Sequence, residues 1–401
     1  MNRPLDRLSP KGARRRQALV VGATLVGGAL VVGCSPADIL ALGAPHDFGA
    51  FGPFIRIGPD GWVTVVSKHI EFGQGSHAGL AAIVAEELDA DWSKVKVAFA
   101  PANAKVYSNA AMGVQGTGGS SAIANSWTQL RNAGASARAM FVQAAAAKWN
   151  VPPGELTVQN GVVSHARSGK QAAFAGLLAD AAKVKPPQAP KLKDPKAFTL
   201  IGTAKVRRKD SGLKSTGAAI YTQDVHLPNM LTAMVAHAPK FGAKVASVDD
   251  AAARKVPGVV DVFQIPTGVA VVAQDTWAAR QGRDALQVKW DETAAETRGS
   301  DQLRQTYADL AAGKAQPTGK AGWQPFHAKG AAANAGGGAP AVPAVPAVEI
   351  TYDFPYLAHA AMEPMNCVAI VKGQSCHLIH GSQSPTLDQL NAAKIVGNLP
   401  G

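Results

Sequence analysis

The feature that most constrains this chain is a low-complexity tract of Ala, Gly and Pro at residues 312–347. No hydrophobic period survives there, and its last part carries a proline at every third position. Proline fixes φ and removes a backbone donor, so the composition favours an extended, semi-rigid linker over a packed element. We therefore expect a linker here, with folded segments on both sides of the tract.

Shifts in composition divide the rest of the chain. A Pro- and Lys-rich stretch at 185–211 is predicted to be a connector, since it lacks a hydrophobic period. The predicted order is an export signal at 1–34, a folded segment at 50–184, the connector at 185–211, a compact unit at 212–295, the linker at 312–347 and an incomplete last segment at 348–401.

The amino-acid composition excludes several classes of protein. Of the 401 residues, 47% are hydrophobic and 17% are charged, which is apolar enough to bury several cores and argues against wholesale disorder. The net charge is +12, but no Lys/Arg run interleaved with aromatic residues predicts a nucleic-acid groove. A basic surface that attracts an anionic cofactor or an acidic partner fits equally well. Three cysteines without a CxxC spacing argue against zinc, iron–sulfur and disulfide frameworks, so any redox chemistry requires another group.

The N-terminus carries a predicted targeting signal. Arg14, Arg15 and Arg16 precede the uncharged apolar stretch 17–33, a pattern typical of twin-arginine export. Small residues then precede Cys34, as in a bacterial lipoprotein processing site. We expect a periplasmic protein, with Cys34 as the candidate for lipid attachment. The alternative is an uncleaved membrane anchor, although the stretch is short for a spanning helix and is diluted by glycines.

Hydrophobic periodicity in the body of the chain predicts an α+β fold. Strands are expected at 54–57, 62–66, 94–99, 156–159, 162–164, 218–221, 230–236, 259–263, 269–273 and 285–290, and helices at 78–88, 120–149, 251–255 and 276–283. Asn160-Gly161 predicts a hairpin turn. A second hairpin is predicted to set Val371 against Cys376, which leaves Cys367 away from Cys376, so no disulfide is expected between them.

Two glycine-rich loops are candidate anion-binding sites. The first, Glu71–His77, lies between a predicted strand and a predicted helix, where free N–H groups favour an anion. The alternative is a tight turn that feeds a core helix. The second, Gln115–Ser121, also opens a helix, and the alternative there is that Ser120 or Ser121 caps it. The two loops would suit a long ligand with a central diphosphate, whereas neither has the spacing of a Rossmann or nucleoside-triphosphatase motif.

A third candidate region contains His359–Pro364 and Ser382–Pro385. Glu363 is a candidate general acid, but a lone Glu before Pro is more often structural, and we favour that interpretation. The histidines show no HxxxH or HExxH spacing, which argues against a His-ligated metal. There is also no GxSxG motif to indicate a serine nucleophile.

Taken in order, the motifs resemble the large, molybdenum-binding subunit of the xanthine dehydrogenase/aldehyde oxidase family, in its isoquinoline 1-oxidoreductase beta-subunit type. The resemblance covers the chain from about residue 50 to its end, apart from the linker. The motifs that carry it are Glu71–Gly75 with Ala85–Leu88, Thr117–Ser121, Lys214–Tyr221, Asp224–Pro228, Val256–Val259, Val269–Ala273, His359–Pro364 and Gln383–Pro385. The unit at 212–295 resembles the α/β hammerhead domain of that family, and the segments around it resemble parts of its molybdopterin-binding domains.

This resemblance implies a molybdopterin cofactor, which in bacterial members is usually the cytosine dinucleotide. The site residues that it implies are Gly73, Gln74, Gly75 and Ser76 on the pterin side, Gly118, Gly119, Ser120 and Ser121 at the dinucleotide phosphates, and Gln383 near the molybdenum oxo group. It implies hydroxylation of a carbon next to nitrogen in a heteroaromatic ring, or of an aldehyde, with water as the oxygen source. The implied partners are an iron–sulfur (alpha) subunit that takes the electrons, a cytochrome acceptor and a small-molecule substrate, with no nucleic acid.

The resemblance also implies a missing part. In the family, a Gly-Gly-Gly-Phe-Gly loop and the general-base glutamate come later than the position of Gly401, so no catalytic residue is assigned within this sequence. We therefore expect a fragment, an early-terminated product or a chain that a second polypeptide completes, inactive by itself. The alternative from another class is a cofactor-free exported protein that serves as a lipid-anchored binding protein.

Overall fold

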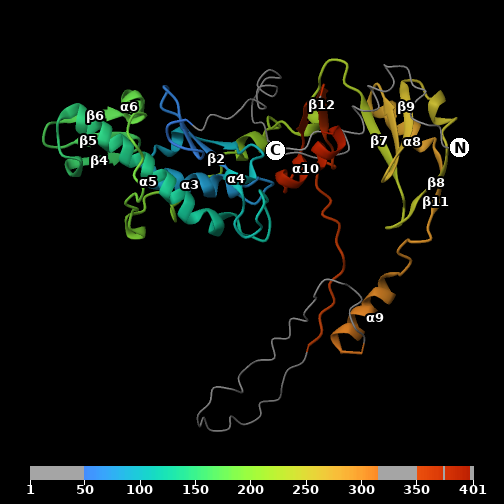
Figure 1. Ribbon diagram of the computed structural model, residues 1–401. Coiled ribbons are helices and arrows are strands. Elements are labelled where there is room, and N and C mark those ends of the chain that lie inside the picture. Colours follow the sequence, from blue (N-terminus) through green and yellow to red (C-terminus); the bar gives the residue numbers. More distant parts are fainter. Residues whose placement is uncertain (1–48, 315–349, 374, 398–401) are drawn as a thin grey trace, which may run out of the picture. The chain divides into compact units, whose positions relative to one another are not determined.

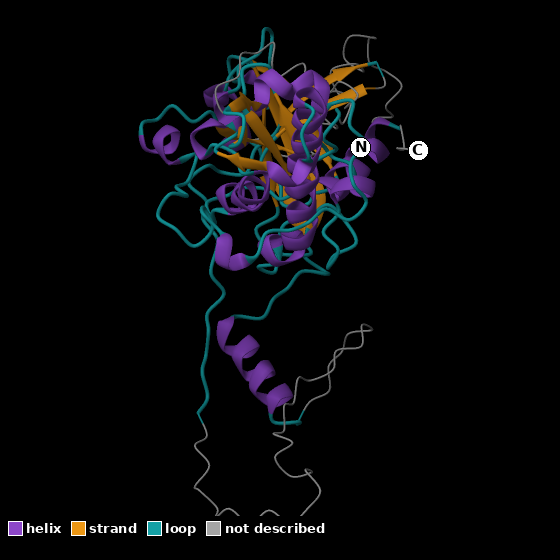
Figure 2. Cartoon of the chain, turned by 90° about the vertical axis from the view of Figure 1, so that its left-hand side faces the viewer, coloured by secondary structure: helices purple, strands orange, loops and turns teal. Residues whose placement is uncertain are grey.

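The computed structural model describes residues 49–314, 350–373 and 375–397. The predicted export signal, Cys34 and most of the predicted linker lie outside these residues. The chain divides into two compact units, one within Met1–Met230 together with Ala361–Gly401 and one within Leu231–Ala360 (Figure 1). Helices and small separate sheets are mixed along the chain, which confirms the predicted α+β fold (Figure 2).

The first unit is built on a three-stranded sheet with the order β1–β2–β3. Strand β1 (Ile55–Ile57) pairs antiparallel with β2 (Val63–Ser67), and β2 pairs parallel with β3 (Val95–Phe99). A parallel pair needs a crossover connection, which helix α3 (Ser76–Leu88) supplies. The long helix α5 (Ala122–Trp149) packs against α3. The predicted strands and helices in this part of the chain are confirmed.

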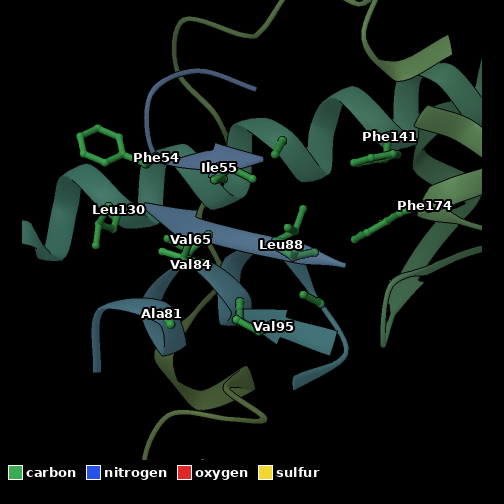
Figure 3. Close-up of a cluster of buried hydrophobic side chains, with 14 of the residues drawn as sticks. Phe54, Ile55, Val65, Ala81, Val84, Leu88, Val95, Leu130, Phe141 and Phe174 are labelled. Atoms are coloured by element: carbon green, nitrogen blue, oxygen red, sulfur yellow. The ribbon is translucent and has the colours of Figure 1, made fainter. Parts of the chain in front are cut away.

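Aliphatic and aromatic side chains from these elements fill the core of the first unit (Figure 3). The rings of Phe141 and Phe174 stack with their centroids 4.2 Å apart, which joins α5 to the segment after it. Gly134 lets the two helices approach closely, since a Cβ there would lie 2.6 Å from the Val84 carbonyl oxygen. The small residue is therefore required by the packing of α5 on α3.

A small sheet follows α5. Its order is β4–β5–β6, and its members are β4 (Leu156–Gln159), β5 (Val162–His165) and β6 (Lys170–Ala173), followed by helix α6 (Phe174–Ala181). Asn160 and Gly161 both have positive φ, at 48° and 74°, which confirms the hairpin turn predicted for Asn-Gly. The Gly161 N–H donates to the Asp89 carbonyl oxygen at 2.7 Å, so the turn is fastened to the end of α3.

The predicted connector is fastened to α3 by a buried carboxylate. Glu86 accepts the backbone N–H groups of Thr199, Leu200 and Ile201 at 3.0, 2.7 and 3.0 Å. The Lys193 ammonium lies 3.0 Å from the same carboxylate. These contacts hold the polypeptide that leads from the first folded segment toward Arg208, which belongs to the site described below.

The second unit contains two small antiparallel sheets. One has the order β7–β10–β9, with β7 (Thr232–His237), β9 (Val259–Ile265) and β10 (Gly268–Ala273), and the other pairs β8 (Lys244–Asp249) with β11 (Gln287–Asp291). All residues of the central strand β10 are buried. Helix α8 (Thr276–Asp284) packs on β7 and β10. The Asp275 side chain caps it by accepting the Ala278 N–H at 2.8 Å.

The last segment returns to the first unit. It forms the hairpin β12 (Val368–Lys372) and β13 (Ser375–Ile379), followed by α10 (Pro385–Val396). The register pairs Val371 with Cys376, as predicted, and the thiols of Cys367 and Cys376 are both free.

Two predicted elements are wrong. Residues 218–221 do not form a strand, because the N–H groups of Ala218 and Ala219 bond to the Leu213 carbonyl oxygen and close the short helix α7 (Ser211–Ser215). Residues 251–255 form only the 3₁₀ turn η6 (Ala253–Lys255). The remaining short elements are α4 (Ala104–Tyr107), α9 (Ser300–Ala311) and the 3₁₀ turns η2 (Trp92–Lys94), η3 (Pro153–Glu155), η4 (Pro195–Ala197) and η5 (Thr222–Asp224).

Within the described ranges, no helix combines the length and the apolar character that crossing a bilayer requires.

Candidate functional site

The first glycine loop, Glu71–His77, folds around its own carboxylate. Glu71 Oε1 accepts the N–H groups of Gly73 and Gly75 at 2.8 and 3.0 Å, and Oε2 accepts that of His77 at 3.1 Å. The Arg208 guanidinium lies 3.2 Å from Oε1 and also donates to the Gly73 carbonyl oxygen at 2.7 Å. The carboxylate thus occupies the place at the start of α3 where an external anion would bind.

Glu71 is charged in this environment. Its burial acts to raise the pKa, but the amides of Gly75, His77 and Gly73 together with Arg208 outweigh burial and hold the pKa of Glu71 below its usual range. Burial is also the main reason that the pKa of His77 falls to about 4, so this ring is neutral at pH 7. The loop therefore contains a fixed negative charge that is satisfied from within the chain.

The side chains of Gln74 and Ser76 in the first loop also bond internally, whereas the buried Nε2 of His77 has no hydrogen-bond partner. The Gln74 side chain donates to the Ile70 carbonyl oxygen at 2.7 Å and accepts the Phe72 N–H at 2.8 Å. The Ser76 hydroxyl donates to the same carbonyl at 2.9 Å. Phe72 stands at the tip of the loop with 57% of its surface exposed. The loop is a rigid turn whose most accessible large side chain is an aromatic ring.

The second glycine loop, Gln115–Ser121, leaves the start of its helix open. Gly119 and Ser120 both have left-handed φ, at 58° and 54°. Ser121 occupies the N-cap position of α5, but its hydroxyl donates to the Gly118 carbonyl oxygen at 2.8 Å and makes no bond to an N–H of the helix. Ser121 is therefore the N-cap residue, but the first N–H groups of α5 take no bond from its side chain.

Three segments far apart in the sequence meet at these loops. The Thr117 hydroxyl accepts the Ile70 N–H at 3.0 Å, which joins the second loop to the first. Thr117 and Gln383 exchange two bonds, from the Thr117 N–H to the Gln383 carbonyl oxygen at 2.8 Å and from Gln383 Nε2 to the Thr117 carbonyl oxygen at 3.0 Å. The Gln115 N–H donates to the Thr386 hydroxyl at 2.9 Å. The structure thus brings both loops and Gln383 into one site.

Lys68 adds a buried positive charge beside the second loop. Its ammonium donates to the Ser108 carbonyl oxygen at 3.3 Å and to the side-chain oxygens of Asn125 and Gln129 at 3.0 and 2.7 Å. All of these acceptors are neutral, Lys68 is only 5% exposed, and its burial lowers its pKa. Asn125 and Gln129 belong to the first turns of α5, where a helix already carries partial positive charge. This arrangement favours an anion nearby.

His69, next along the chain, is fully buried. Its Nδ1 lies 3.4 Å from the Thr117 hydroxyl, and its Nε2 has no hydrogen-bond partner. Burial, with a smaller contribution from Lys68, lowers the pKa of His69 to about 4. The ring is therefore neutral at pH 7 and adds no second positive charge to the site.

Glu363 lies in a different set of contacts. Its Oε1 accepts the Gln223 N–H at 3.0 Å and the Asn366 side-chain N–H at 3.0 Å. These bonds tie the turn at 222–224 to the segment that returns from the second unit, which supports the structural interpretation of Glu363. The side chain of His359 is exposed.

Sequence reasoning missed several residues that organise the site, namely Lys68, Asn109, Arg208 and Thr386. Asn109 is fully buried and its side chain donates to the Ser121 hydroxyl at 2.8 Å. Lys68 lies two residues after a predicted apolar strand, where a burial argument could have singled it out. Arg208 and Thr386 carried no such signal, since their importance depends on contacts across 137 and 271 residues of sequence.

The donor set at the second loop fits an anionic, phosphate-bearing cofactor. The N–H groups at the start of α5 take no side-chain cap from Ser121, and no side-chain or backbone atom lies within 4 Å of where a Cβ on Gly119 would project. Lys68 supplies positive charge without a carboxylate partner among the described residues. That part of the chain also holds no group of three or more His, Cys, Asp or Glu side chains that could bind a metal ion.

A family description matches this part of the chain. Residues 11–239, more than half of the sequence, match the family described as the molybdopterin cofactor-binding domain. This chain belongs to the molybdopterin cofactor-binding family. The match contains both glycine loops, Lys68 and Arg208, and it confirms the resemblance inferred from the motifs.

Three known proteins are similar to this chain in sequence. The beta chain of isoquinoline 1-oxidoreductase from Brevundimonas diminuta is 35% identical over 383 residues, covering 86% of this chain and 48% of the relative. A membrane-bound aldehyde dehydrogenase [pyrroloquinoline-quinone] of Gluconacetobacter polyoxogenes is 35% identical, covering 60% and 32%. A nicotinate dehydrogenase subunit of Pseudomonas putida is 31% identical, covering 59% and 20%. The chain spans about half or less of the length of these relatives.

Solved structures show weaker likenesses. Quinoline 2-oxidoreductase from Pseudomonas putida 86 shares 23% identity with a TM-score of 0.22, over 45% of this chain and 23% of that one. A Cu,Mo-CO dehydrogenase shares 22% identity with a TM-score of 0.19, over 21% and 15%. Likenesses of this extent carry no argument about the site.

Proposed function

We propose that this chain is the cofactor-binding part of a molybdenum hydroxylase large subunit. The proposal rests on one observation: Thr117 in the second glycine loop is hydrogen-bonded both to the residue before the first loop, Ile70, and to Gln383. A loop that opens a helix without a side-chain cap, beside a buried lysine, is suited to the phosphates of a dinucleotide. Membership of the molybdopterin cofactor-binding family makes a molybdenum-pterin group the expected ligand.

We assign the residues as follows. The segment Gly118–Ser121 binds the phosphates of the cofactor, which we propose to be the cytosine dinucleotide form. Gln383, held by Thr117, presents its remaining polar atoms near the metal end. Gly73, Gln74, Gly75 and Ser76 form the rigid turn on the pterin side. When bound, the group supplies the two-electron oxidation of carbon with oxygen from water. The role of this chain is to bind and orient that group.

The substrate class follows from the relatives. Their names point to isoquinoline, nicotinate and aldehydes, so we propose an N-heteroaromatic compound or an aldehyde. Electrons leave through a separate iron–sulfur subunit and then a cytochrome. Three cysteines in the whole sequence are too few for a four-cysteine cluster, which supports this division of labour.

We also propose a periplasmic location. The arginines at 14–16 and the apolar stretch after them support twin-arginine export, a route that carries folded proteins with cofactors already bound. Lipid attachment at Cys34 would then anchor the protein. The N-terminal sequence and mass of the protein isolated from the producing cell distinguish a lipidated Cys34 from soluble and uncleaved forms.

The cofactor assignment is tested on the protein isolated from that cell. Elemental analysis is expected to give about one molybdenum per polypeptide, and mild acid hydrolysis is expected to release cytidine monophosphate. A Gln383→Ala variant should retain less molybdenum, whereas Gln305→Ala, on the exposed face of α9, should retain as much as the wild type. Folded protein that carries neither molybdenum nor pterin would overturn the proposal and favour a cofactor-free binding protein.

A further inference from the structure

We propose that Glu71 is a positioning residue that acts as the internal anion of the first glycine loop and closes that loop to external anions. Only one consequence of this inference rests on the proposed function, namely which of the two loops binds the phosphates of the cofactor. Its structural basis is the set of donors around one side chain, the N–H groups of Gly73, Gly75 and His77 and the guanidinium of Arg208.

The geometry makes Glu71 an occupant of the anion position. Gly73 and Gly75 have φ values of 114° and 87°, a conformation that residues with a side chain rarely adopt, and their N–H groups point at the carboxylate. The carboxylate receives these groups with both oxygens, and Glu71 is only 5% exposed. Arg208 completes the arrangement and is itself paired with Asp210 at 3.0 Å, and Lys214 lies 2.6 Å from the same Asp210 carboxylate. The charges in the first loop are therefore balanced before any ligand arrives.

The second loop provides the contrast. The Ser121 side chain does not cap α5, and the buried ammonium of Lys68 beside this loop bonds only to neutral oxygens. One loop therefore has its donors satisfied by a carboxylate, and the other has positive potential without one. We infer that an anionic ligand enters at the second loop, while the first loop contributes shape and the exposed ring of Phe72.

Glu71→Ala tests this inference, because the truncation removes the four heavy atoms of an acetate ion. We expect the cofactor-free variant to lose about 5–10 °C in Tm, since several charge-assisted hydrogen bonds disappear. Added sodium acetate should restore part of this loss by entering the vacated position, and inorganic phosphate should raise the Tm of the variant more than that of the wild type. Sodium chloride at equal ionic strength should have no such effect.

Matched variants distinguish anion binding at the vacated position from a nonspecific loss of stability. Glu71→Gln keeps the volume filled and should not respond to acetate. Glu155→Ala removes a carboxylate that bonds to the side chains of His165 and Arg167, without an amide nest, and should not respond either. A Glu71→Ala protein that is folded but indifferent to acetate and phosphate would overturn the inference.

If Glu71→Ala does not fold, hydrogen exchange on the wild type decides the question. The amides of Gly73, Gly75 and His77 should exchange slowly, because each donates to a buried carboxylate. Exchange of Gly73 and Gly75 as fast as that of exposed loop amides would overturn the inference. These measurements need no cofactor, so their outcome is independent of the molybdenum content that tests the proposed function.

Discussion

At the scale of single residues, the site depends on where charges are balanced and where they are not. Glu71 is surrounded by donors, whereas Lys68 bonds only to uncharged oxygens. Both side chains are buried, where an unbalanced charge is costly. We therefore expect Glu71 to control how stability depends on pH and Lys68 to control how tightly the protein binds anions.

Glu71 should make the stability of the first unit depend on acid pH. Its folded pKa lies below the unfolded value, so its contribution is complete above the unfolded pKa of about 4.3 and is lost as the pH falls through the folded value. The charge that faces Glu71 is Arg208, which is paired with Asp210, and Asp210 is in turn paired with Lys214; His77 is neutral above its pKa of about 4. Urea unfolding should show Glu71→Gln to be less stable than the wild type by about 2 kcal/mol at pH 7, with the difference shrinking below pH ~4.

The control for this pH experiment is Glu292→Gln. Glu292 pairs with Lys240 at the exposed surface of the second unit, where an ion pair contributes little at any pH. A difference between wild type and Glu71→Gln that stays constant from pH 7 to pH 3 would contradict the assignment of a lowered pKa.

Lys68 should govern the affinity for anions. Replacing it with Met removes the buried charge, and we expect pyrophosphate to bind the cofactor-free protein about tenfold more weakly by calorimetry, which corresponds to about 1.4 kcal/mol. Lys68→Arg keeps the charge and should keep most of the affinity. Equal affinities for the wild type and both variants would show that Lys68 only fastens β2 to α5.

At the scale of elements, the contact of α3 with α5 sets the frame on which both loops sit. A side chain at Gly134 would meet the Val84 carbonyl oxygen at 2.6 Å and the Leu88 nitrogen at 3.3 Å. These are backbone atoms, which cannot move without shifting a whole helix. The loops that begin the two helices would shift with them.

Gly134→Ala is therefore expected to destabilise the protein by about 2–3 kcal/mol, despite the higher helix propensity of Ala. Gly176→Ala is the matched control, because Gly176 lies in α6 with no atom within 4 Å of its would-be Cβ. That substitution should leave stability unchanged or raise it by up to about 1 kcal/mol. Denaturant unfolding followed by circular dichroism compares the two, and equal stabilities would refute the proposed close approach.

At the scale of the whole molecule, the first unit is completed by a segment that enters it after the entire second unit. Thr117 and Gln383 are 266 residues apart, and Gln115 and Thr386 are 271 apart, yet both pairs are hydrogen-bonded. Long loops between contacts add little to the free energy of closure, so such an insertion is tolerated. Gln383 joins the two loops only when the return segment is docked.

Thr386→Val tests this docking. The substitution keeps the shape but removes the acceptor of the Gln115 N–H, which we expect to lower the stability of the first unit by about 1–2 kcal/mol and to reduce molybdenum retention. Thr306→Val is the control, because the Thr306 hydroxyl bonds only within the exposed helix α9. Equal unfolding curves and metal contents for the two variants would show that the return segment does not depend on this bond.

The sequence alone determined the helices and strands with a clear hydrophobic period and the turns whose residues accept positive φ. β2, β3, α3 and α5 follow from apolar patterning, and the turn at Asn160-Gly161 follows from the positive φ that its residues accept. The order of motifs was enough to identify the family, because each motif is local. The strand expected at 218–221 failed since local hydrogen bonds to Leu213 close a helix there instead.

Only the tertiary structure decided how the two glycine loops differ. In the sequence both are glycine-rich turns before a helix, and both looked suited to an anion. The first loop folds around its own Glu71 carboxylate, and the fold adds the guanidinium of Arg208 there and the ammonium of Lys68 near the second loop. The physical reason is that a local pattern fixes backbone conformation, whereas the charge that a loop experiences also depends on residues brought close in space by packing.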